Sequence, residues 1–350
     1  MGTPIEHQRQ NWERAHGPPL IVIVGPTGVG KTAVAVELAE ALDGEIISAD
    51  SRQLYRGMDI GTAKPTPEEL ARVRHHMVDV LDPHETMTVA EYQQMAYTAI
   101  GDLHRRGKVP FLVGGTGLYV RAVVEGFTIP RVPPDPALRA RLARRAKREG
   151  VHVLHAELAA VDPEAANKID PRNVRRVIRA LEVYAKTGRP ISELQRRRPP
   201  PYRILQIGLT RERAALYRRC DERIRRMIAA GLVQEVEHLV AQGYTPETCE
   251  AMTGLGYPET VAYLRGELPS LDELARAIGR STRRFIRHQY GWFRLNDPRI
   301  IWFDLDHTDV TTIRELVATW LSTPPEETGH SQGIRPPARA EHREMGARHG

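Results

Sequence analysis

The chain has 350 residues, of which 41% are hydrophobic and 27% charged, and its formal net charge at pH 7 is +6. This composition predicts a soluble globular protein of one large or two ordinary domains. No apolar run reaches the length of a membrane span, the N-terminal residues lack the apolar core of a signal peptide, and Cys220 and Cys249 are too few for a disulfide framework or a metal cluster. We therefore expect a cytoplasmic protein with no membrane partner, in which both cysteines are small buried side chains.

Positive charge is concentrated in one part of the chain. Residues 129–203 hold 18 Lys and Arg against 8 Asp and Glu, a net charge of +10, whereas the rest of the chain has a net charge of −4. Such a local excess indicates a polyanionic partner. The charge pattern leaves open an arginine-rich helical surface that contacts only water.

Short apolar runs alternate with helical patterns over the first 125 residues. Continuous apolar runs are typical of strands buried on both faces of a parallel sheet, and their alternation with helices predicts a doubly wound α/β domain. We expect strands at 20–24, 45–48, 77–81 and 110–114, and helices at 31–42, 67–74, 89–106 and 117–125.

Prolines interrupt this alternation after residue 129 and again before residue 203. We therefore divide the chain into a core of which 18–128 is the first part, a basic helical insertion at 129–203, a continuation of the core at 204–322, and a disordered tail at 323–350. Further helices are expected after 136 and at 151–161, 163–168, 172–186, 211–230, 232–242 and 271–294, with strands at 204–209 and 300–306.

Residues 25–32, GPTGVGKT, fit the phosphate-binding pattern G-x-x-x-x-G-K-[ST] between an expected strand and an expected helix. The glycines let the turn fold back, so that backbone N–H groups and the helix N-terminus face a phosphate chain. Lys31 can reach phosphate oxygens, and the Thr32 hydroxyl can ligate a Mg²⁺ ion that they hold. The candidate phosphate-binding residues are Gly25, Pro26, Thr27, Gly28, Val29, Gly30, Lys31 and Thr32.

A second candidate group is the carboxylate of Asp50, which follows the second expected strand. Ligands of α/β sheets bind at this end of the strands, where Asp50 could accept a proton from a nucleophile or help to hold Mg²⁺. Asp50 and Ser51 could instead cap the next element. An NTPase usually has a later strand that ends in Asp, but Gly114 and Gly115 stand there in this chain, which weakens an ATPase interpretation without excluding it.

Several stretches together resemble the tRNA dimethylallyltransferases, which prenylate N6 of an adenosine in tRNA. The resemblance extends over about residues 20–305, and YRGMDIGTAKP is far more specific than the phosphate loop. The stretches are GPTGVGKT, ADSRQLYRGMDIGTAKP, HHMVDVLDP, LVGGTGLYVRAVVEG, RNVRRVIRALEVYAKTGRPISEL, LYRRCDERIRRMIAAGLVQEV, GLGYPETVAYLRGEL and TRRFIRHQYGWFR.

The resemblance implies a P-loop NTPase-like fold with a helical insertion, Mg²⁺ as cofactor, and dimethylallyl diphosphate and a tRNA anticodon stem-loop as substrates. The phosphate loop would then hold the pyrophosphate of the donor, Asp50 would be the general base, Arg223 would contact the pyrophosphate, and Thr116 would lie near the flipped adenine. The dimethylallyl group would pass to N6 of the adenosine immediately 3′ of the anticodon (position 37 of the tRNA). The implied tRNA contacts are Asp50, Ser51, Arg52, Gln53, Thr116, Arg175, Arg176, Arg179, Thr253, Gly256, Tyr257, Arg287, His288, Gln289 and Arg294.

Helical spacing places Arg219, Arg223 and Arg226 along the edge of an apolar stripe, where they could face a cleft. The same spacing by itself is also typical of an ordinary amphipathic helix. His288 departs from the family pattern, because it replaces an arginine and removes a fixed charge. Two alternatives remain at this point. One is a P-loop kinase that transfers the γ-phosphate of ATP to a small molecule or nucleotide; the other is a non-enzymatic RNA-binding protein, which the intact Lys31 disfavours. We expect a monomer.

Overall fold

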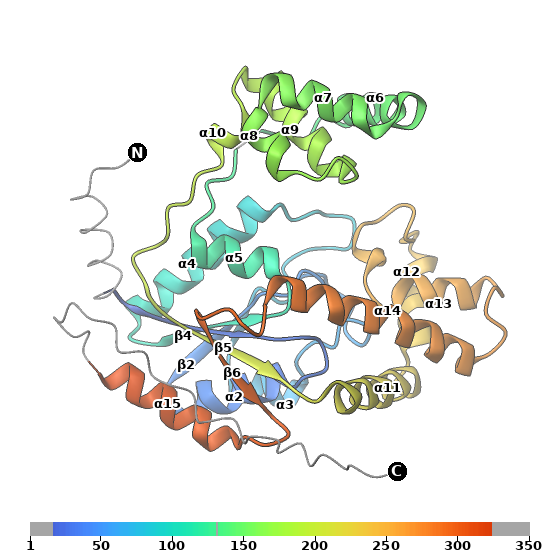
Figure 1. Cartoon of the computed structure of the whole chain (residues 1–350). Coiled ribbons are helices and arrows are strands. Elements are labelled where there is room, and N and C mark those ends of the chain that lie inside the picture. Colours follow the sequence, from blue (N-terminus) through green and yellow to red (C-terminus); the bar gives the residue numbers. More distant parts are fainter. Residues whose placement is uncertain (1–16, 131, 324–350) are drawn as a thin grey trace, which may run out of the picture.

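The computed structural model describes residues 17–130 and 132–323, so the predicted tail lies outside the described residues from 324 onward. Within those ranges six strands form one all-parallel sheet in the order β3-β2-β4-β1-β5-β6 (Figure 1). The predicted fold class is therefore confirmed. The strands are β1 (Pro19–Val24), β2 (Gly44–Ser48), β3 (His75–His76), β4 (Val109–Gly114), β5 (Arg203–Thr210) and β6 (Ile300–Asp304).

Alternate residues of β1 face two different cores. Leu20, Val22 and Val24 pack in the core that includes α4 and α5, whereas Ile21 and Ile23 pack in the core that includes α2 and α15. Both faces of the strand are thus covered, which is why its apolar run is continuous. The helices on the two faces are α2 (Lys31–Ala41), α3 (Pro67–Arg72), α4 (Val89–Arg105), α5 (Gly117–Glu125) and α15 (Val310–Ser322).

A group of helices contributed by the second half of the chain lies beside the carboxyl ends of the strands (Figure 1). Helix α14 packs on α5, α11 and α13, and so joins this group to the sheet layer. The phosphate loop, which follows β1, meets these helices directly. Their bounds are α11 (Arg213–Ala229), α12 (Leu232–Ala241), the 3₁₀ turn η1 (Ala251–Thr253), α13 (Tyr257–Leu264) and α14 (Leu271–Trp292).

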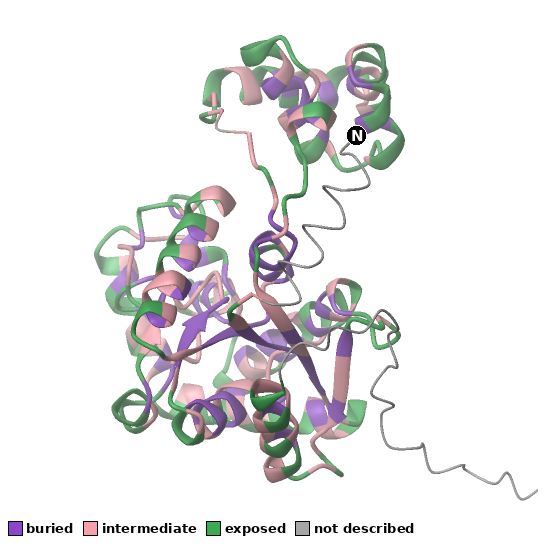
Figure 2. Cartoon of the chain, turned by 90° about the vertical axis from the view of Figure 1, so that its left-hand side faces the viewer, coloured by how far each residue is buried: buried purple, intermediate pink, exposed green. Residues whose placement is uncertain are grey.

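The basic middle of the chain folds into a separate helical layer with its own apolar core (Figure 2). Two segments connect it to the sheet layer. They are paired where they leave it, because Thr128 N–H donates to the carbonyl of Arg196 and Arg198 N–H to that of Gly126. The helices are α6 (Pro136–Glu149), α7 (Val151–Val161), α8 (Pro163–Lys168), α9 (Val174–Thr187) and α10 (Ile191–Leu194).

One predicted strand, at 77–81, is wrong. Strand β3 ends at His76, because Met77 and Asp79 adopt left-handed backbone conformations with φ of 64° and 55°. Only an isolated parallel bridge between Tyr55 and Leu81 remains of the extension. Helices α10, α13 and α15 have no counterpart among the predicted elements.

The described part of the chain contains no helix that combines the length and the apolar character needed to cross a bilayer. Both cysteines are buried and free, as predicted.

Candidate active site

The phosphate loop is a tight turn that uses glycine where the backbone requires it. Gly28 and Gly30 have φ of 80° and 114°, and Gly30 is the N-cap of α2. Helix α11 closes the loop from outside, because a Cβ atom on Gly28 would lie 2.4 Å from Sγ of Cys220. The loop thus lies between α11 and the N-terminus of α2, where backbone N–H groups and the helix dipole favour an anion.

Lys31 lies within this turn. Its Nζ atom donates hydrogen bonds to the carbonyls of Gly25 and Pro26, each at 3.0 Å. Burial lowers the pKa of Lys31 to about 8, while the charge of Asp50 acts in the opposite direction. An ammonium group held among carbonyls in a desolvated turn gains a strong partner when a phosphate arrives.

Arg223 of α11 reaches the same turn from the opposite side. Its Nη2 atom donates to Oγ1 of Thr27 at 2.8 Å, whereas its Nε atom is buried and has no hydrogen-bond partner in the protein. Burial lowers the pKa of the guanidinium, because desolvation disfavours the charged form. A buried guanidinium with an unused donor is suited to hold an anion, and the loop beside it has the backbone geometry of an anion site.

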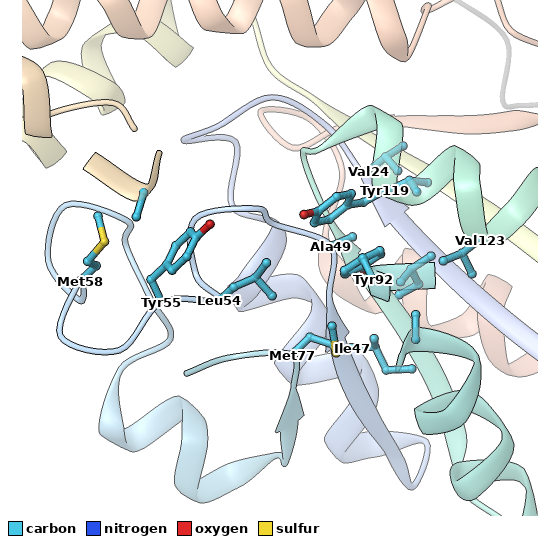
Figure 3. Close-up of a cluster of buried hydrophobic side chains, with 14 of the residues drawn as sticks. Val24, Ile47, Ala49, Leu54, Tyr55, Met58, Met77, Tyr92, Tyr119 and Val123 are labelled. Atoms are coloured by element: carbon cyan, nitrogen blue, oxygen red, sulfur yellow. The ribbon is translucent and has the colours of Figure 1, made fainter. Parts of the chain in front are cut away.

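Asp50 is placed by the end of β2. The hydroxyl of Tyr92 donates to the carbonyl of Ser48 at 2.9 Å, and its ring stacks on that of Tyr119 at a centroid distance of 3.8 Å. These contacts fix the end of the strand. Figure 3 shows both rings beside Ala49, the residue before Asp50. One oxygen of Asp50, Oδ1, accepts the N–H of Arg52 at 2.9 Å. The next residue, Ser51, donates its N–H to Oγ1 of Thr116 at 3.0 Å.

Two cavities meet at these groups. The first, which we call the P-loop cavity, has a volume of about 370 Å³ and extends from the first turn of α2, at Thr32, to His75 on β3. The second, the Thr116 cavity, has a volume of about 340 Å³ and extends to Phe285 on α14. The residues that line both cavities are Thr27, Lys31, Asp50, Thr62, Ala63 and Arg223. Ligands in the two cavities would therefore share these residues as neighbours.

The wall at Thr62 and Ala63 is fixed by a carboxylate that the sequence analysis did not identify. Oε2 of Glu235, on α12, accepts the N–H groups of Asp59 and Ile60 at 2.8 and 2.7 Å. Oε1 of the same residue accepts the N–H of Gly61 at 3.1 Å and the hydroxyl of Tyr257 at 2.8 Å. This network holds the middle of the YRGMDIGTAKP stretch, but its acidic partner lies over 170 residues away, so no local pattern could reveal it.

The predicted tRNA contacts fall into three groups. Asp50, Ser51, Arg52, Thr116, Thr253 and Gly256 line the Thr116 cavity, as do Tyr257 and Gln289 of the second group. Gln53, Tyr257, Gln289 and Arg179 use their polar atoms on other protein groups. Arg175, Arg176, Arg287, His288 and Arg294 are exposed. All fifteen remain predictions as tRNA contacts.

Two predicted contacts on the same helix differ in how far they are exposed. Arg175 and Arg179 lie four residues apart on α9, yet the Arg175 side chain is 89% exposed and the Arg179 side chain 28%. Arg179 donates to the fully buried Glu182 and to backbone carbonyls of the connecting segment. Arg139 of the basic helix α6 also pairs with Glu182, so part of the positive charge stabilises the insertion itself.

An all-parallel sheet with a glycine-rich phosphate loop after its central strand defines a P-loop-like α/β protein. Comparison with known proteins narrows this class. The sequence profile of the IPP transferase family matches residues 53–296, and the chain belongs to this family.

Individual relatives agree. The chain is 53% identical over 287 residues to a tRNA dimethylallyltransferase of Thermomicrobium roseum, covering 82% of this chain and 86% of the relative. It is 55% identical over 285 residues to a tRNA dimethylallyltransferase of Chloroflexus aurantiacus, covering 81% of this chain and 95% of the relative.

Solved structures agree as well. A tRNA isopentenylpyrophosphate transferase of Bacillus halodurans matches with a TM-score of 0.65 and 42% identity, covering 87% of this chain and 97% of the other. A eukaryotic dimethylallyltransferase described as acting on tRNA matches with a TM-score of 0.73 and 26% identity, covering 89% of this chain and 81% of the other. The family resemblance seen in the sequence is confirmed.

Proposed function

We propose that this protein transfers the dimethylallyl group of dimethylallyl diphosphate to the exocyclic N6 of the adenosine 3′-adjacent to the anticodon of tRNA, with release of pyrophosphate. The observation that carries the proposal is the junction of the two cavities, where Lys31, Asp50 and Arg223 converge. The names of the relatives support prenyl transfer to tRNA, and nothing in them or in the geometry favours the kinase alternative.

On the donor side, the residues around the phosphate loop stabilise the leaving group. As the bond between the allylic carbon and the bridging oxygen breaks, negative charge accumulates on the pyrophosphate. Lys31 donates to carbonyls of the turn in which that charge would develop, and Arg223 contacts the same turn through Thr27 while its Nε donor stays unused. Fixed donors in a desolvated site stabilise such charge more strongly than water does, because they need no reorganisation during the reaction.

On the acceptor side, Asp50 makes the amine a better nucleophile. The lone pair of an aryl amine is delocalised into the ring, so attack is helped when a base takes the N6 proton as the N–C bond forms. One oxygen of Asp50 is already engaged with the N–H of Arg52, which leaves Oδ2 for this proton. Overall, one N–H bond and one C–O bond break, one N–C bond forms, and the proton passes to Asp50.

A Mg²⁺ ion fits the donor set of the P-loop cavity. The Thr32 hydroxyl lines this cavity at the N-terminus of α2, and among the described residues no cluster of three or more His, Cys, Asp or Glu is arranged to hold a metal. Mg²⁺ is commonly held in this way, by one or two protein oxygens together with substrate phosphates and waters. The bound ion would supply further positive charge to the leaving pyrophosphate.

One incubation tests the proposal. Unmodified anticodon stem-loop RNA is mixed with the enzyme, Mg²⁺ and dimethylallyl diphosphate labelled in the five-carbon unit; in parallel, γ-labelled ATP is offered to the RNA and to a panel of small alcohols and nucleotides. We expect label from the diphosphate in the RNA, located at the adenosine 3′ of the anticodon after nuclease digestion. Phosphate transfer from ATP without prenylation would overturn the proposal.

A further inference from the structure

We propose that Gln289 is a positioning residue that locks the phosphate loop to the segment beside Asp50 and thereby sets the distance between the leaving pyrophosphate and the base. This inference rests on the proposed function. It assigns to Gln289 a task different from the tRNA contact that the family resemblance implies.

The geometry of the Gln289 side chain is that of a bridge between two backbones. Its Oε1 atom accepts the N–H of Thr27 in the phosphate loop at 2.8 Å, and its Nε2 atom donates to the carbonyl of Gly115 after β4 at 3.1 Å. The residue is only 3% exposed. A Cβ atom on Gly115 would lie 2.2 Å from Nε2, so the glycine leaves the space that the amide occupies.

The bridge continues on both sides into the groups that carry the chemistry. Beyond Thr27 lies Arg223, which donates to the threonine hydroxyl. Beyond Gly115 lies Thr116, which accepts the N–H of Ser51, the neighbour of Asp50. A single buried side chain thus connects the loop that would hold the leaving group with the strand end that carries the base.

An apolar side chain of similar volume would fill this space but would leave two backbone groups unpaired. A buried N–H or C=O without a partner is unfavourable, and each would move toward another partner. The loop and the Gly115 segment would then be free to separate. Because a misplacement of about 1 Å can cost about 10² in rate, this freedom affects the reaction before it affects the fold.

The main test uses Gln289→Leu, with Arg284→Gln as the matched control. Arg284 is an exposed residue of the same helix, outside both cavities. In single-turnover assays at saturating substrates, we expect the transfer rate of Gln289→Leu to fall at least about tenfold, while the stem-loop Kd and the pyrophosphate Kd change less than about threefold. Arg284→Gln should transfer at the wild-type rate. A Gln289→Leu rate within about twofold of wild type would overturn the proposal.

A double-variant cycle separates positioning from simple loss of stability. If Gln289 acts through the placement of Asp50, Gln289→Leu should lower the residual rate of an Asp50→Asn enzyme less than about twofold. An undiminished tenfold loss in that background would contradict the proposal. Should Gln289→Leu fail to fold, Gln289→Glu enters the same assays, because it keeps an acceptor for Thr27 and replaces the donor to Gly115 by a carboxylate oxygen.

Amide hydrogen exchange tests the lock without catalysis. Exchange at Thr27, measured for the phosphate loop of the full chain, should accelerate at least about tenfold in Gln289→Leu while exchange in β1 and β4 is unchanged. Unchanged exchange at Thr27 would show that no lock exists. If the wild-type enzyme fails to prenylate RNA but this exchange result holds, the proposed function fails while the lock stands, so the two failures are distinguishable.

Discussion

The Nη2 atom of Arg223 donates a hydrogen bond to Oγ1 of Thr27 at 2.8 Å and so joins helix α11 to the phosphate loop. The two residues lie 196 positions apart in the chain. Their contact places a guanidinium, with a second donor still unpaired, beside the turn that would receive the pyrophosphate. The first prediction follows from this contact.

Arg223→Ala should raise the activation barrier by about 3–4 kcal/mol, a loss of about 10²–10³ in kcat, because it removes a fixed donor to the leaving group. Arg223→Lys keeps the charge but not the planar guanidinium, so its kcat should lie between those of the wild type and Arg223→Ala. Steady-state kinetics with dimethylallyl diphosphate as the varied substrate give the result. Full activity of Arg223→Ala would place the guanidinium outside the reaction.

Asp50→Asn should lower the transfer rate by at least about 10² while stem-loop affinity stays nearly constant, because the amide cannot take the N6 proton. Asparagine is preferable to alanine here, since its Oδ1 atom can still accept the N–H of Arg52. Single-turnover transfer and RNA binding are measured on the same preparation. Unchanged turnover would remove Asp50 from the mechanism.

Lys31 should give the free enzyme a characteristic dependence of stability on pH. Burial lowers the pKa of Lys31 from 10.5 to about 8. Between these values the unfolded chain binds more protons than the folded one, so the free energy of unfolding rises with pH across this window. The burial penalty is fully present below pH 8. Lys31→Met should therefore be more stable than wild type at pH 7, and denaturant titrations should show this difference shrinking toward pH 10.

The same shift predicts weaker pyrophosphate binding in alkaline solution. As pH rises through about 8, wild-type Lys31 loses its charge, whereas Lys31→Arg keeps its charge because the pKa of arginine is far higher. The ratio of the two pyrophosphate Kd values, measured by calorimetry from pH 7 to 10, corrects for the titration of pyrophosphate itself. A ratio independent of pH would contradict the lowered pKa.

Removing Arg175 and Arg176 should reduce the salt dependence of RNA binding. Both are exposed on α9, and each lost contact to single-stranded RNA should lower the slope of log K against log salt by up to about 0.7. Arg179→Ala serves as the contrast, because its guanidinium pairs with buried Glu182 and should mainly destabilise the insertion. An unaltered slope in the Arg175→Ala, Arg176→Ala variant would mean that this face of α9 contacts only water.

Glu235→Gln should lower the free energy of unfolding by about 1–3 kcal/mol. In the wild type, backbone N–H groups donate to both carboxylate oxygens, whereas in the variant the amide NH₂ group would face some of these donors. Activity of the folded variant should fall as well, because the loop from Asp59 to Gly61 leads into the wall of both cavities. Urea titration measures the first effect, and Tyr257→Phe, which removes one donor of the same network, should show a smaller one. Equal stability of wild type and Glu235→Gln would exclude this anchoring role.

Features that depend on local spacing could be predicted from the order of the residues. The phosphate loop is recognisable because Gly28, Gly30 and Lys31 act within one turn, and the strands are recognisable because buried strands need continuous apolar runs. Asp50 could be placed near the loop from sheet topology, since the carboxyl ends of parallel strands share one edge. Local spacing failed at 77–81, where left-handed residues end β3 inside an apolar pattern.

The distant side chains that complete the site could not be predicted in this way, because the packing of separate elements brings them together. Gln289 meets Thr27 across 262 positions and Glu235 meets the loop at Asp59 across 176, and no periodicity extends so far. The family resemblance likewise gave Arg175 and Arg179 the same role, whereas the pairing of Arg179 with Glu182 draws its side chain inward and leaves Arg175 exposed. The physical reason is that spacing fixes the direction in which a side chain points, whereas its partner is fixed by how separate elements pack.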